Sequence, residues 1–106
     1  MESNNFGLSS EIVKNINTIF GAYPKITEVI IFGSRAKESY RYNSDIDLAI
    51  KATNFSLTQL QDIEVKIENL YLPYTVDVLD YSKIENQDLI SHIDRIGKIF
   101  YKKQRR

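Results

Sequence analysis

The sequence contains no cysteine and no tryptophan, and it has only two prolines and four glycines. The absence of cysteine excludes disulfide bonds, a thiol nucleophile and thiolate metal ligands. Basic and acidic residues number fourteen each, so no excess of one charge points to nucleic acid as a partner. No apolar run approaches the roughly 18 residues needed to span a bilayer, and the first residues lack a signal-peptide core. We therefore expect a cytoplasmic protein that binds neither membranes nor nucleic acid directly.

The length of 106 residues suits one domain with a single modest core. We expect this domain to cover residues 1–106, with 101–106 as a basic tail. Apolar residues at helical spacing predict helices over about 10–20, 57–70 and 86–97. Short β-branched runs predict strands over 28–32, 45–50 and 75–79, with an edge strand over 98–101.

Polar residues mark the starts of the predicted helices. Ser9 precedes the first apolar stripe, and Asn86 is placed to cap the last one. Ser56 and Gln59 have the spacing of a capping box.

The connections between strands predict the sheet. A dozen polar residues join the first two strands, so we expect these strands to be antiparallel neighbours. The helix between the second and third strands is long enough for a crossover, which makes those two parallel. The fold class is therefore α+β, a small mixed sheet flanked by helices.

A glycine–serine pair and an aspartate-x-aspartate pair stand ten residues apart in the stretch GSRAKESYRYNSDID. In the predicted topology, Gly33 and Ser34 end the first strand beside Asp45 and Asp47, which begin the second. Asp77, in the middle of the third strand, falls at the same end of the sheet. The sequence therefore predicts a polar site at this end.

Three converging carboxylates repel one another unless cations lie between them. Carboxylates that leave coordination positions open suit Mg²⁺, and two such ions roughly 3.5–4 Å apart can assist an in-line phosphoryl displacement. Gly33 allows the backbone to approach a phosphate closely, because it has no Cβ. Ser34 offers a hydroxyl and caps a predicted helical turn, and Arg35 suits phosphate oxygens. These residues are candidate metal and nucleotide ligands.

The spacing Gly33-Ser34-x10-Asp45-x-Asp47 resembles the active-site motif of the polymerase-β-type nucleotidyltransferase superfamily. The blocks IIFGSRA, SDIDLAI and VDVLD, and the final Ile-x-x-x-Gly-Lys-Ile-Phe-Tyr, resemble the minimal nucleotidyltransferase (MNT) family over about residues 10–101. The resemblance implies a nucleotidyltransferase-like fold.

The same resemblance implies a role for each residue of the motif. Gly33 and Ser34 would hold the nucleotide triphosphate, and Asp45 and Asp47 would ligate Mg²⁺. Asp77 would complete the metal site and help to deprotonate the acceptor hydroxyl.

Many MNT proteins are paired with a HEPN protein, so the resemblance implies an antitoxin. Such an antitoxin would transfer AMP from ATP to a tyrosine hydroxyl of its partner, a HEPN ribonuclease toxin. Two alternatives stay open: a binding module that neutralises its partner by contact alone, and a nucleotidyltransferase that acts on a small molecule.

Three further side chains have weaker signals. We expect the single histidine, His92, to have a structural or solvent-facing role. Tyr40 and Tyr42 lie in the motif loop, where they are suited to partner contact or surface packing, or to stacking on a base.

Overall fold

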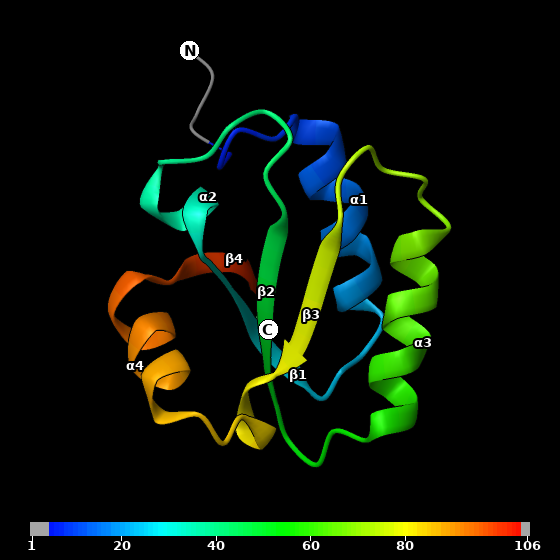
Figure 1. Cartoon of the computed structure of the whole chain (residues 1–106). Coiled ribbons are helices and arrows are strands. Elements are labelled where there is room, and N and C mark those ends of the chain that lie inside the picture. Colours follow the sequence, from blue (N-terminus) through cyan, green and yellow to red (C-terminus); the bar gives the residue numbers. More distant parts are fainter. Residues whose placement is uncertain (1–4, 105–106) are drawn as a thin grey trace.

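A four-stranded mixed sheet forms the centre of the computed structural model, which describes residues 5–104 (Figure 1). The chain runs through α1 (Ser10–Gly21), β1 (Ile26–Phe32), α2 (Ser34–Lys37), β2 (Ile46–Ala52), α3 (Leu57–Glu68), β3 (Val76–Asp80), the 3₁₀ turn η1 (Tyr81–Lys83), α4 (Gln87–Ile96) and β4 (Lys98–Lys102). The strand order is β3-β2-β1-β4. β1 is antiparallel to both β2 and β4, whereas β2 and β3 are parallel. The predicted α+β fold class is confirmed.

β4 pairs with β1 as the predicted edge strand, and it extends one residue further than predicted, through Lys102. The predicted basic tail over 101–106 therefore overlaps the strand. Residues 105 and 106 of that tail lie outside the described residues.

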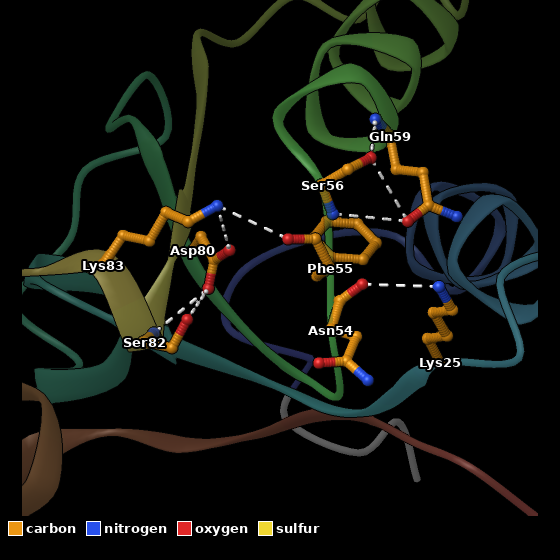
Figure 2. Close-up of polar contacts among 8 residues, drawn as sticks. All are labelled: Lys25, Asn54, Phe55, Ser56, Gln59, Asp80, Ser82 and Lys83. Carbon is orange, nitrogen blue, oxygen red and sulfur yellow. Dashed lines mark hydrogen bonds and ion pairs between the residues drawn. The ribbon is translucent and has the colours of Figure 1, made fainter.

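Polar side chains cap three helices, and the predicted caps at α3 and α4 are confirmed. The Ser9 hydroxyl accepts a hydrogen bond from the backbone N–H of Ile12 at the start of α1. Ser56 and Gln59 form a reciprocal capping box at α3, which Figure 2 shows. The Asn86 side chain accepts from two backbone N–H groups at the start of α4. Each such cap is worth about 1 kcal/mol, so these local signals fix where the helices begin.

The central strands β1 and β2 bury residues on both faces, because helices cover both sides of the sheet (Figure 1). Along β1, Val29 and Ile31 face the core formed with α1 and α3, whereas Ile30 and Phe32 face the smaller core under α4. The two cores together explain why the strands read as almost continuous apolar runs. Among the described residues, none of the helices is long and apolar enough to cross a membrane.

A buried aspartate fastens the end of the sheet where β3 finishes. The Asp80 carboxylate accepts hydrogen bonds from the backbone N–H and the hydroxyl of Ser82, and it lies 3.7 Å from the Lys83 ammonium group. Lys83 also donates to the carbonyl of Phe55, so it links η1 to the loop before α3 (Figure 2). Asp80 is therefore a structural residue at the end of the sheet away from the GSRAKESYRYNSDID loop.

Gly97 joins α4 to β4 at a point where no side chain fits. A Cβ there would lie 2.4 Å from both the Ile30 Cγ2 atom and the Ile93 carbonyl oxygen. We predict that Gly97→Ala lowers the free energy of unfolding by about 1–3 kcal/mol in urea titrations, because either the backbone or Ile30 must move. Gly21→Ala is the control: its Cβ would meet only the Tyr101 hydroxyl, at 3.8 Å, and stability should be unchanged or slightly raised.

Candidate active site

The strand registers bring the motif residues to one end of the sheet. β1 pairs Phe32 with Asp47, so Gly33 directly follows the strand end beside this aspartate. β2 pairs Asp47 with Asp77 in the parallel register. Both aspartates alternate with residues of the α1/α3 core, so their side chains lie on the face covered by α4. Asp45 precedes β2 in an exposed connection.

Gly33 and Asp47 make the closest approach in this region. Gly33 has a φ of +76°, a conformation that L side chains rarely adopt. A Cβ on Gly33 would lie only 2.4 Å from Oδ2 of Asp47. The backbone of Gly33 is therefore held close to the Asp47 carboxylate. Only glycine satisfies both requirements.

Asp47 is the electrostatic centre of the cluster. Burial raises the pKa of its half-buried carboxyl, and the negative charges of Asp77 and Asp45 raise it further, as does a hydrogen bond with Asp77. His92 opposes this rise. A cation placed beside these carboxylates would relieve their mutual repulsion.

The donor set fits a magnesium ion that arrives with a nucleotide. Oxygen ligands suit Mg²⁺, which is commonly held by one or two carboxylates together with substrate phosphates. Within the described part of the chain, no three acidic or histidine side chains are gathered into a ready-made metal site. Asp45, Asp47 and Asp77, next to Gly33, are the carboxylates that could hold such an ion.

Ser34 occupies the first position of α2 and does not cap it. Gly33 is the N-cap, without a side-chain hydrogen bond, so the predicted capping role of Ser34 is wrong. The reason is that Gly33, with its positive φ, already takes the non-helical backbone of a cap, which leaves Ser34 inside the helical turn. The Ser34 hydroxyl lies directly after the glycine that faces Asp47, and its predicted role toward phosphate stays a prediction.

Arg35 is completely buried, with an exposed fraction of 0%. Its guanidinium donates to three backbone carbonyls: Ser44 at 3.0 and 3.1 Å, Phe6 at 2.7 Å and Tyr42 at 3.3 Å. It also stacks over the rings of Tyr40 and Tyr74, at 5.3 and 4.8 Å. Arg35 thus ties the N-terminal segment, the motif loop and the loop before β3 together. Its predicted role as a phosphate ligand stays a prediction, and its bonds in this structure are to protein carbonyls.

The two tyrosines of the motif loop differ in exposure. Tyr40 packs against Arg35, and a side chain on Gly7 would collide with its ring. Tyr42 offers its carbonyl to Arg35 while its side chain remains 85% exposed. Surface packing therefore describes Tyr40, and Tyr42 is the one available to a partner or a base.

His92 lies in the site although sequence reasoning gave it a structural or solvent-facing role. Its Nε2 atom accepts a hydrogen bond from the Gly33 N–H at 3.3 Å, and its ring packs edge-on against Phe32. The two partners are 59 residues apart in the sequence. The only signal in the sequence was that His92 is the single histidine and precedes an apolar helical position, which does not specify a partner.

Comparison with known proteins gives a family match over most of the chain. The family model described as "Polymerase beta, Nucleotidyltransferase" matches residues 14–106. No curated protein matches the sequence significantly.

Several solved structures share the fold. A chain of a toxin–antitoxin complex crystallised with AMP-PNP is 21% identical, with a TM-score of 0.69 over 92% of this chain and 76% of that one. A chain from the complex of a tri-AMPylated Shewanella oneidensis HEPN toxin with MNT antitoxin is 19% identical, with a TM-score of 0.67 over 92% of this chain and 75% of that one. The MntA–HepT toxin–antitoxin gives 20% identity and a TM-score of 0.67, over 91% and 74%. At these identities the likeness establishes the fold.

The raised pKa of Asp47 predicts a stability change with a definite sign. A carboxyl whose pKa rises on folding destabilises the fold as pH increases through that raised pKa. Without divalent cations, Asp47→Asn should therefore be more stable than the wild type at neutral pH, and the difference should vanish below about pH 4. Urea titrations at both pH values measure this.

Asp62→Asn is the matched control, because the Tyr23 hydroxyl, and then Lys66, lower the pKa of Asp62. It should lower stability at neutral pH instead. An Asp47→Asn protein that is less stable than the wild type at neutral pH would contradict the repulsion described here.

The buried guanidinium predicts that Arg35 cannot be replaced by lysine. Lysine keeps the charge but loses the planar set of donors, so Arg35→Lys should cost about 2 kcal/mol or more in unfolding free energy. Arg41→Lys, at an exposed position of the same loop, should change stability by less than about 0.5 kcal/mol. Equal effects in the two variants, measured by urea unfolding, would mean that the carbonyl contacts contribute nothing.

Proposed function

The chain belongs to the polymerase beta nucleotidyltransferase family, and on that premise we propose that it is an MNT antitoxin that transfers AMP from ATP to a tyrosine hydroxyl of a HEPN ribonuclease toxin. The reaction requires Mg²⁺, as two ions, and takes place in the cytoplasm. Modification of the tyrosine neutralises the toxin, because it adds phosphate charge beside a site that binds anionic RNA.

One observation carries this proposal: the carboxylate of Asp47 lies against the backbone of Gly33 and beside Asp77 on the next strand. A nucleotidyltransferase needs a place where phosphate oxygens and metal-binding carboxylates meet. The amide of Gly33 and the hydroxyl of Ser34 supply donors for the phosphate oxygens, and Asp45 and Asp47 supply the carboxylates. Asp77 is exposed next to them, where an acceptor from outside can reach it.

In the proposed reaction, the acceptor oxygen attacks the α-phosphorus of ATP. A new oxygen–phosphorus bond forms, the bond to the β-phosphate oxygen breaks, and pyrophosphate leaves. Asp77 takes the proton of the acceptor hydroxyl as general base. Asp45 and Asp47 would hold Mg²⁺, which would supply positive charge to neutralise the attacked phosphate and the departing pyrophosphate. Gly33 and Ser34 orient the triphosphate so that the leaving group lies opposite the acceptor.

The structural neighbours support the choice of substrate and partner. One of them was crystallised with AMP-PNP, an analogue of ATP. Another is a complex of an MNT antitoxin with a HEPN toxin that carries three AMP groups. By analogy, we assign to this chain ATP as the nucleotide and a HEPN toxin as the protein acceptor.

His92 has a positioning role in this proposal. Its Nε2 atom holds the Gly33 N–H in the absence of a nucleotide, and the edge-on contact with Phe32 fixes the ring. His92 and a phosphate oxygen would accept from the same Gly33 N–H. The contact with His92 therefore holds the glycine backbone in the orientation that a phosphate needs.

We predict that Asp45→Asn and Asp47→Asn each abolish AMP transfer to a HEPN partner protein. Each change removes a metal ligand while it keeps the shape of the side chain. Incubation with ATP and Mg²⁺, followed by intact mass measurement of the HEPN protein, counts the AMP groups added. Asp62→Asn, on α3 and therefore on the opposite face of the sheet, should label the partner like the wild type.

The same variants separate chemistry from contact. If Asp47→Asn neutralises the ribonuclease fully without labelling it, contact alone is the mechanism and the enzymatic proposal fails. Normal labelling by both variants would mean that the metal assignment is wrong.

A further inference from the structure

A groove of about 520 Å³ runs beside the outermost strand of the sheet, between β3 and α3. It lies on the face opposite Asp47, because its strand residues Val76 and Val78 point toward the α1/α3 core. Ile67 of α3 lies under it, and Tyr71 stands at its margin. The groove is therefore separate from the nucleotide site, although the two share β3.

The strand beside this groove has an open edge. β3 is last in the sheet order, and no strand of the described residues pairs with its outer side (Figure 1). The carbonyl of Thr75 accepts a hydrogen bond from the N–H of Ile46, so it points inward to β2. Alternation along a parallel strand then turns the backbone groups of Val76 and Val78 outward. An open strand edge next to a groove is a surface to which another chain can bind.

Two glutamates give the groove a definite charge. Glu64 and Glu68 line it from α3, one helical turn apart, and both are exposed. The chain as a whole has a net charge of zero, so this negative charge is local. Carboxylates above an apolar floor repel phosphates and suit a lysine or arginine, whose apolar stem packs while its charged end pairs.

Tyr71 places a large ring at the rim of the groove. Its side chain is 86% exposed, and its backbone has a φ of +53°. The left-handed backbone conformation of Tyr71 costs some folding free energy. Exposed tyrosines are frequent anchors of protein–protein interfaces, because they bury a large area and lose little side-chain entropy on binding.

We propose that this groove is the docking surface for the acceptor protein, which inserts a lysine or arginine between Glu64 and Glu68; the inference rests on the proposed function. The groove reaches Val76, and the next residue, Asp77, faces the nucleotide side. A partner seated over the edge of β3 thus touches the groove on one face and brings its hydroxyl to Asp77 on the other. The groove selects the acceptor, and the aspartates carry out the transfer.

Charge reversal tests the proposal. The variant Glu64→Arg/Glu68→Arg should bind the HEPN protein that the wild type labels with AMP at least about tenfold more weakly, in calorimetric titrations without ATP. The Kd of the wild-type complex should also rise with salt, whereas the reversed variant should lose this dependence. Affinity for Mg²⁺ with a non-hydrolysable ATP analogue should be unchanged, because the variant residues lie on the other face of the sheet.

The matched control is Glu11→Arg/Glu85→Arg, which makes the same change of charge at exposed positions on α1 and before α4. It should bind the acceptor like the wild type. Equal affinities for the reversed variant and this control would overturn the docking surface and leave AMP transfer intact. Tight, groove-dependent binding with no AMP transferred by the wild type would overturn the proposed function and leave the docking surface intact.

Discussion

The close approach of the Gly33 backbone to the Asp47 carboxylate is the constraint around which this small domain is organised. Antiparallel pairing of β1 with β2 places the two residues side by side, and parallel pairing with β3 adds Asp77. The cluster costs stability, since burial and two neighbouring carboxylates all raise the pKa of Asp47. Such clusters of carboxylates with a raised pKa are frequent at functional sites, where a bound ligand relieves the repulsion. A cation shared with a triphosphate is the ligand that suits these oxygens.

Arg35 is the residue that allows this arrangement to persist. Its buried guanidinium holds carbonyls of Phe6, Tyr42 and Ser44, so the loop that leads to Asp45 is fastened to the N-terminal segment. Each of these carbonyls would otherwise need another donor, because buried polar groups are costly when unpaired. Candidate site residues and a structural residue therefore lie next to one another. Gly33 brings its backbone close to Asp47, Ser34 offers a hydroxyl, and Arg35 holds the loop in place.

Local patterns in the sequence predicted most of the fold. Helix caps such as Ser56 with Gln59 are short-range signals, and the polar loop and crossover helix determine strand direction, so the sheet followed with small errors at strand ends. The close approach of Gly33 to Asp47, with Asp77 alongside, was predictable for the same reason, because strand order brings these residues to one edge. The partners of Arg35 and His92 were not, since they depend on packing between segments up to 59 residues apart that no periodicity encodes. The groove beside β3 was missed as well, because it is a property of how α3 lies against the strand.

We propose that the two surfaces that meet at β3 have separate roles: the carboxylates on the α4 face carry out the transfer, and the acidic groove on the α3 face binds the acceptor. The position of the cation tests the central claim most directly. Anomalous diffraction from crystals grown with Mn²⁺ and a non-hydrolysable ATP analogue should place metal between the Asp45 and Asp47 carboxylates, with the triphosphate against Gly33 and Ser34. Metal bound only at Asp80 or in the groove, with no density beside Asp47, would contradict the account.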